Sequence, residues 1–328
     1  MIGRAALKPV IGRLATSPPF SRRTSRQLAR RVGIVYYHYV GDSTPWYSDF
    51  YAGTTAERLD RDLAELARWF EFASLREVVD GHSGHARPRL ALTFDDGFDL
   101  MRTGVLEVLE RHGVSATTFV ITSCVDNVGL MWRNKLSAAR ARRGDDVCGR
   151  AYNLVASAHE IAPISSGLEL MHASRVWPMH RKDELADALW EACDMPPLAD
   201  FLEEQRPYLG WDGLRTWIER GHSVGLHTRT HPYCERLGPE AEVDEIVEPA
   251  RELRERLGVE WLPLSYPFGS RLRADSERRL FEAGVYDCAL GIAGFAPAGT
   301  PAHRLERAAA ERHLAYHVFG RAFAGRPG

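Results

Sequence analysis

The stretch Leu90-Ala91-Leu92-Thr93-Phe94-Asp95-Asp96-Gly97 places a short apolar run directly before two adjacent acids and a glycine. Such a run predicts a buried strand, and chemistry in α/β proteins collects where strands end. Two neighbouring carboxylates resist joint ionisation unless a cation lies beside them. The pair therefore predicts a metal site with one acid as ligand and the other as base. An ordinary Asp-Gly turn is the alternative.

Strand and helix patterns alternate on both sides of this stretch. We expect strands at 33–40, 88–94, 116–121, 223–226, 261–266, 286–290 and 304–310, with a short strand within 72–79. We expect helices at 55–70, 105–112, 212–220, 239–257 (kinked at Pro249) and 276–283. Strand–helix–strand order implies parallel strands joined by crossovers. The alternation predicts an α/β domain over residues 32–320, followed by a tail at 321–328.

Residues 125–207 break this alternation. They contain helix-like segments at 131–143, 151–161, 168–176, 182–193 and 198–204, with no clear strand between them. Insertions that follow strands shape the mouth of α/β barrels. We therefore expect a helical insertion that caps the substrate side.

Composition narrows the class of protein. Of 328 residues, 45% are apolar and 26% charged, as in ordinary soluble domains. The net charge of −2 gives no reason to expect a nucleic-acid partner. Five scattered cysteines without a CxxC pair argue against a disulfide framework or a thiolate zinc site. The sequence gives no indication of the oligomeric state.

The basic arm, residues 1–31, has eight Lys or Arg residues, and no acid precedes Asp42. Pro9, Gly12 and Arg13 interrupt its only candidate for the apolar part of a secretory signal. No apolar run reaches the roughly 18 residues of a membrane span. We expect a protein of the cytoplasm or the inner membrane face. The arm is either solvated and partly disordered or in contact with an anionic membrane surface.

A second motif, His227-Thr228-Arg229-Thr230-His231-Pro232, follows the strand that ends at Leu226. Two histidines four apart can face one point if the chain turns helically. Two imidazoles and one carboxylate leave coordination positions open, as in hydrolytic metal sites. The alternative is a surface loop with two unrelated histidines, but the position after a parallel strand favours ligands.

Together these two motifs resemble those of the polysaccharide deacetylases of carbohydrate esterase family four. Their order fits, and the segment 266–269 (Tyr-Pro-Phe-Gly) is similar to the YPxG branch that acts on exopolysaccharides. The resemblance covers roughly residues 34–307, interrupted by the insertion. It implies a distorted, incomplete (β/α) barrel, TIM-like and seven-stranded.

The resemblance also implies roles for individual residues. Asp96, His227 and His231 would hold a divalent metal, usually Zn²⁺ and sometimes Co²⁺ or Ni²⁺. Asp95 would be the general base. The backbone N–H of Phe268 would stabilise the oxyanion.

Two departures from the family pattern concern the supporting groups. Ser265 stands where many members have an arginine that orients the base, and the late Leu-x-His that supplies the general acid is not clear. His303 is a candidate acid at the wrong offset, with a surface histidine as the alternative. Arg307, at the end of an expected strand, is a candidate for orienting a carboxylate.

Four residues are candidates for substrate contact. Tyr266 and Pro267 belong to the third motif. Trp132 opens the insertion and would either stack on a sugar or begin a solvated helix. His38 would lie beneath the metal site or be a satisfied core histidine.

These features predict a metal-dependent hydrolase that removes N-acetyl groups from an amino-sugar glycan or glycoconjugate and releases acetate. One alternative is an O-acetyl esterase or small-amide deacylase on the same fold. An alternative of another class is a non-catalytic glycan-binding protein, suggested by the missing arginine and acid. The Asp95, Asp96, His227 and His231 set argues against it, because binding alone needs no base beside a metal.

Overall fold

A parallel sheet forms the core of the computed structural model, which describes residues 4–41, 53–81, 87–311 and 314–321. The strands are β1 (Gly33–Tyr37), β2 (Glu71–Phe72), β3 (Arg89–Phe94), β4 (Ala116–Val120), β5 (Ser223–Leu226), β6 (Pro263–Ser265), β7 (Cys288–Gly291), β8 (Leu305–Glu306) and β9 (Ala308–Ala309). Their order is β8-β7-β6-β5-β4-β3-β1-β9, and β2 pairs with the start of β3.

The last strand nearly closes this sheet into a barrel. Only Arg307 separates β8, which pairs with β7, from β9, which pairs with β1. All of these pairings are parallel, so the carboxyl ends of the strands meet at one edge. The predicted distorted (β/α) barrel is confirmed, and β8 and β9 act as one strand of the ring.

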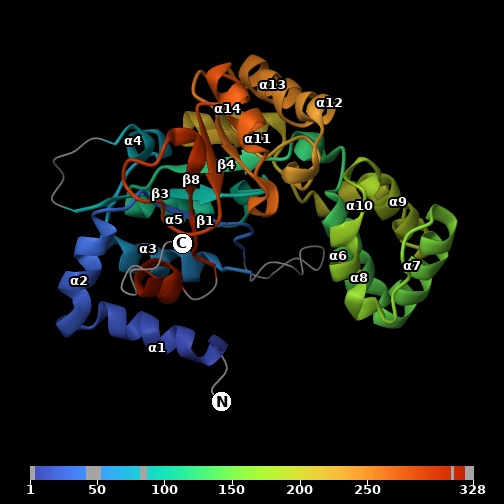
Figure 1. Ribbon diagram of the computed structural model, residues 1–328, viewed down its shortest axis with the longest axis horizontal. Helices are drawn as coiled ribbons and strands as arrows, with labels where there is room; N and C mark the ends of the chain where they lie inside the picture. The colour runs from blue at the N-terminus through green and yellow to red at the C-terminus, as the bar shows by residue number, and fades with distance from the viewer. Residues whose placement is uncertain (1–3, 42–52, 82–86, 312–313, 322–328) are drawn as a thin grey trace.

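Helices cover the outside of the barrel (Figure 1). They are α3 (Ala56–Ala67), α4 (Leu75–Asp80), α5 (Val105–His112), α11 (Trp211–Glu219), α12 (Pro239–Glu242), α13 (Glu248–Leu257) and α14 (Ala274–Glu282). In α3 the expected apolar face is buried through Leu59, Leu63 and Leu66.

One local expectation needs correction, and one is refined. The strand expected within 72–79 is limited to Glu71–Phe72, because Ser74 and Glu77 form a capping box that begins α4. The helix expected at 239–257 is continuous through α12, the π-helical segment Val243–Val247 and α13, and Pro249 lies just after the π-helical segment. The wider π-helical turn accommodates a residue that has no backbone N–H.

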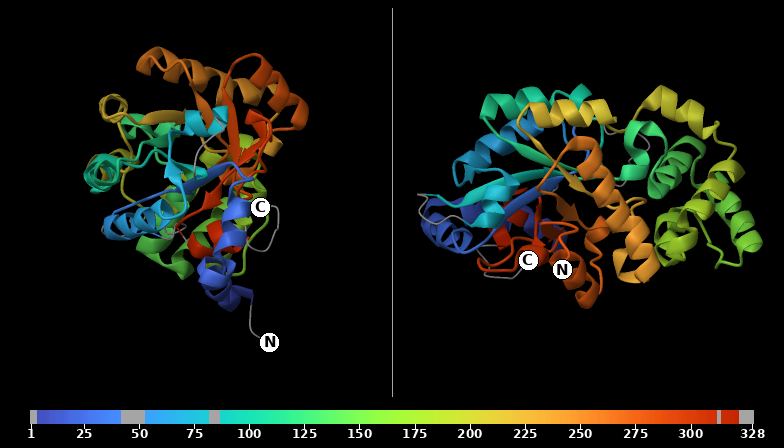
Figure 2. Two further views of the ribbon diagram at one scale, coloured as in Figure 1. Left: turned by 90° about the vertical axis from the view of Figure 1, so that its left-hand side faces the viewer. Right: turned by 90° about the horizontal axis from the view of Figure 1, so that it is seen from above.

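The insertion forms a helical lobe to one side of the barrel (Figures 1 and 2). Its main helices are α6 (Trp132–Arg143), α7 (Asp145–His159), α8 (Leu170–Ala173), α9 (Lys182–Ala192) and α10 (Leu198–Gln205). Residues 125–207, all of them described, contain no strand. The lobe has its own apolar core around Trp132, Trp177 and Trp190, which continues into the barrel through Phe98 and Ile121.

The basic arm is folded over residues 4–28, so the expectation of partial disorder is wrong there. It forms α1 (Arg4–Thr16) and α2 (Pro18–Leu28). Helix α1 packs on the π-helical segment η11 (Ala315–Gly320) through Gly12, where an added Cβ would lie 2.8 Å from the Ala315 carbonyl carbon. Ala15 and Leu28 are buried. No described helix is both long and apolar enough to cross a membrane.

Candidate active site

The carboxyl edge of the barrel gathers the motifs that lie far apart in the sequence. Asp95 and Asp96 follow β3, His227 follows β5, and Ser265 ends β6. Arg307 lies in the last strand, between β8 and β9. Because all of these strands are parallel, their ends bring the five side chains to one place.

Asp96, His227 and His231 converge as predicted for metal ligands. Oδ1 of Asp96 lies 3.3 Å from Nε2 of His227 and 3.3 Å from Nε2 of His231. One ligand atom from each residue lies within 4.8 Å of the others, and all three side chains are buried. A carboxylate and two imidazoles form a donor set suited to zinc and related ions.

Unusual backbone conformations direct two of these ligands inward. Asp96 and His231 have φ of 72° and 60°, a region that non-glycine residues rarely adopt. Thr228, with φ of 64°, accepts a hydrogen bond from the His231 backbone N–H at its hydroxyl oxygen, 3.0 Å away. This hydrogen bond fixes the turn. The helical turn expected after β5 is not formed, and Thr228 and His231 adopt left-handed backbone conformations instead.

The hydrogen bond of the His227 ring sets its tautomer. Nδ1 lies 2.7 Å from the Ser265 carbonyl oxygen, which can only accept a hydrogen bond. Nδ1 therefore carries the proton, and Nε2 faces Asp96 with its lone pair. This is the tautomer that a metal ligand requires.

Arg307 holds the second acid. Its Nη1 and Nη2 donate to Oδ1 and Oδ2 of Asp95 at 2.7 and 2.8 Å, and Nη2 also donates to the Ser265 hydroxyl at 2.6 Å. Arg307 is fully buried and Asp95 is 3% exposed. The guanidinium thus comes from the last strand, and Ser265 leaves room for it where many family members have an arginine.

Charges around the site keep both acids ionised. Burial acts to raise the pKa of Asp95, but Arg307 and His227 outweigh it and hold that pKa below its ordinary value. Burial is likewise outweighed at Asp96, where the neighbouring His227 and His231 rings hold the pKa well below the usual range. Burial lowers the pKa of His231 to about 4, so its ring is neutral at neutral pH.

A pocket of about 400 Å³ opens over these residues. Asp95, His227 and His231 line it together with His38 and Glu311. Nδ1 of His38 makes a short hydrogen bond to Glu311. Burial acts to lower the pKa of His38, but Glu311 and the two aspartates raise it to about 9. The sequence reasoning did not find Glu311, which follows the last strand without a recognisable motif.

Phe268 forms another wall of this pocket. Its ring lies edge-on to His231 with 4.5 Å between centroids, and the Arg133 guanidinium lies 4.9 Å from its centre. Its φ of 58° places the residue in a tight turn after Pro267. The oxyanion role of its backbone N–H stays a prediction.

Three of the expected residues have other surroundings. Trp132 is fully buried and donates from Nε1 to the His231 carbonyl oxygen at 2.9 Å, so it cannot stack on a sugar. His303 lies outside the pocket, with its ring 4.9 Å from that of Phe281, which argues against its role as the acid. Pro267 is buried and does not line the pocket, whereas Tyr266 does.

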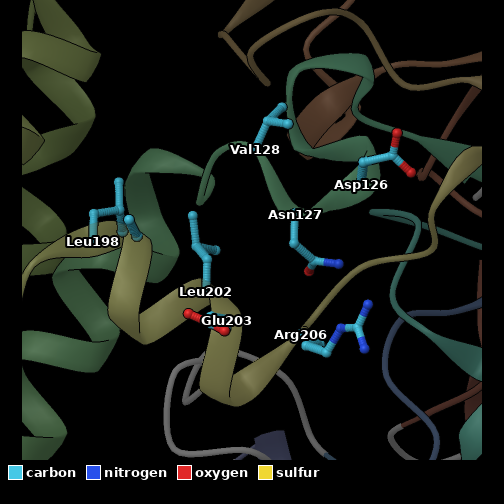
Figure 3. A pocket seen from close by; sticks show the side chains of 8 residues that line it. Asp126, Asn127, Val128, Leu198, Leu202, Glu203 and Arg206 are labelled. Atoms are coloured by element: carbon cyan, nitrogen blue, oxygen red, sulfur yellow. The ribbon is translucent and has the colours of Figure 1, made fainter.

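A second hollow, of about 760 Å³, lies between α10 and the segment Thr122–Asn127 (Figure 3). Two of its polar residues serve the fold. Asp126 accepts from the Trp211 backbone N–H, and Asn127 bonds to both backbone groups of Tyr208. The reactive groups therefore belong to the first pocket.

Comparison with known proteins agrees with this architecture. The family model for polysaccharide deacetylase matches residues 82–285, and the chain belongs to that family. No curated protein sequence matches the chain.

Three solved structures share the fold. The deacetylase PplD of Streptococcus pyogenes, in complex with acetate, is 16% identical with a TM-score of 0.54, covering 85% of this chain and 92% of its own. IcaB of Ammonifex degensii is 15% identical with a TM-score of 0.53, and the match covers 87% of this chain and 96% of IcaB. The BpsB deacetylase domain of Bordetella bronchiseptica is 14% identical with a TM-score of 0.51, and the match covers 86% of this chain and 96% of that domain.

Proposed function

We propose that this deacetylase is a metal-dependent hydrolase that removes N-acetyl groups from an amino sugar in a glycan or glycoconjugate. The observation that carries the proposal is the convergence of Asp96, His227 and His231 beside Asp95. Water and the acetylated sugar are the substrates, and acetate and the free amine are the products. PplD and IcaB are similar in fold, and PplD is described as a deacetylase.

The three ligand residues fit a divalent cation, with Zn²⁺ as the first choice and Co²⁺ or Ni²⁺ as others. The His227 tautomer leaves Nε2 free, and the pKa of His231 keeps its ring neutral. A carboxylate ligand, here Asp96, supplies the negative charge. When bound, such a cation supplies a Lewis acid that activates water and polarises the acetyl carbonyl.

Asp95 is suited to be the general base. Its pKa lies below the ordinary value, so it is a carboxylate at neutral pH and can accept a proton from the attacking water. Arg307 occupies both of its oxygens at rest and fixes their direction. The Phe268 backbone N–H would donate to the oxyanion that forms on the acetyl oxygen.

His38 is better placed than His303 to be the general acid. It lines the pocket, and its pKa of about 9 keeps it protonated at neutral pH. Transfer of its proton to the sugar nitrogen lets the amine leave as the carbon–nitrogen bond breaks. The proton that Asp95 gains can return to solvent or to His38 after turnover.

The test is acetate release from a panel of acetylated substrates. N-acetylglucosamine oligomers should release acetate, and acetylated xylan and small amides should release far less. A chelator should abolish release, and the ion added back should restore it. Faster release from xylan or small amides would favour an O-acetyl esterase or a deacylase, and no release from any substrate would favour a glycan-binding protein. The presence of Arg307 against Asp95 removes one of the two grounds for the last alternative, the missing arginine; the other was the missing acid.

A further inference from the structure

Helix α1 turns an apolar and basic face away from the protein. Its inward face packs on η11 through Gly12 and Ala15. On the opposite face Val10 and Leu14, one helical turn apart, are 52% and 45% exposed, and the exposed Arg13 lies beside them. Apolar and cationic side chains therefore share this face of the helix.

Helix α2 continues this pattern. Thr24 is buried and donates to the Ala15 carbonyl oxygen at 2.8 Å, which fixes the two helices together. Arg22 and Arg26, four residues apart, are exposed on the side away from Thr24, whereas Phe20, 38% exposed, lies one turn before Thr24 on the same side. The arm itself contains no acid, and no acid elsewhere in the described residues forms an ion pair with these two arginines.

We propose that the outward face of α1 and α2 docks on an anionic lipid bilayer. Basic helices with apolar side chains on the same surface bind in the headgroup region through both buried apolar area and charge. A nucleic acid would engage the arginines but would leave Val10 and Leu14 in water. The outward faces lie at the edge of the molecule, where Figure 1 shows α1 and α2 in blue.

Docking through this face would bring the active-site pocket near the membrane. Helix α1 packs on η11, and His317 of that segment lines the pocket. Acetylated glycans carried on lipids or held at the membrane surface would then reach the site. This consequence depends on the proposed function, but the docking itself does not.

The experiment measures co-sedimentation of the full chain with vesicles. One set is pure phosphatidylcholine, and in the other phosphatidylglycerol replaces a third of it. The test variants are Arg13→Glu/Arg22→Glu/Arg26→Glu and Val10→Ser/Leu14→Ser. The control Arg142→Glu/Arg150→Glu/Arg278→Glu makes the same charge change at exposed positions outside the arm. Thermal melting establishes that each variant is folded.

We expect binding to the anionic vesicles alone. The arm charge variant should lose affinity on the order of a hundredfold, because each basic residue near the surface contributes about 1 kcal/mol. The serine variant should also lose affinity, and the control should bind like the wild type. Equal sedimentation with both vesicle sets, or an unaffected arm charge variant, would overturn the proposal. Binding of a single-stranded RNA that needs the arginines, with the serine variant still on the vesicles, would also overturn it and indicate a nucleic-acid surface.

Discussion

Arg307 and Asp95 form a two-point ion pair inside the barrel, with Nη1–Oδ1 and Nη2–Oδ2 distances of 2.7 and 2.8 Å. The arginine lies in the last strand of the barrel, far in sequence from the acid. Burial of two charges is costly unless the pair is well aligned and further hydrogen-bonded. Ser265 and Thr93 supply those further bonds to the guanidinium. Closure of the barrel therefore also fixes the proposed base.

Loss of the guanidinium should shift the pH dependence of activity. In Arg307→Gln, burial would dominate and raise the pKa of Asp95, so the acid limb of kcat/KM should move to higher pH. Arg307→Lys keeps a charge but loses the two-point geometry, and kcat should fall about a hundredfold. Rate measurements across pH, with circular dichroism to establish folding, test both. An unshifted acid limb in Arg307→Gln would contradict a positioning role.

Glu311 should control the alkaline limb of the pH–activity profile, where activity falls as pH rises. It is the main group that raises the pKa of His38 to about 9. If His38 donates the proton, activity falls as pH rises through that value. Glu311→Gln should lower the pKa of His38 and move this limb to lower pH. Glu306→Gln removes a carboxylate that pairs with Arg271 outside the pocket, and this control should leave the limb in place. If the two variants give the same profile, His38 is not the acid.

Trp132 should act on stability and the metal rather than on sugar binding. Trp132→Phe removes the N–H that holds the His231 carbonyl and some buried volume, and unfolding free energy should fall by about 1–3 kcal/mol. Metal affinity should fall with it, and KM for the glycan should not change. Trp190→Phe, which loses a similar bond to Pro196 within the lobe, should lower stability alone. If KM for the glycan rose in Trp132→Phe but not in Trp190→Phe, Trp132 would contact the sugar after all.

The sequence was sufficient for the barrel and for the convergence of the three proposed metal ligands, because both depend on local patterns. Each strand is a short apolar run. Asp96 and His227 come within two residues of the ends of such runs, and His231 lies in the turn that follows β5. Parallel strands then bring these ends together whatever the length of the connections. Arg307 was found for the same reason, since it lies at a predicted strand.

Other residues depended on packing that no local pattern records. Trp132 has an aromatic side chain suited equally to a sugar or to a core, and the fold of the lobe decided for the core. Glu311 carries no motif and is recognisable only from its bond to His38. The basic arm packs on η11 through Gly12, a contact between opposite ends of the chain.

The most direct test of the account compares metal content and acetate release in the wild type, Asp95→Asn and His231→Ala. The wild type should bind one divalent ion per chain and release acetate. Asp95→Asn should keep the ion, because Asp95 is not a ligand, and lose at least about a hundredfold in rate. His231→Ala should lose both. A wild-type chain without an ion that still releases acetate, or Asp95→Asn that retains full activity, would contradict the account.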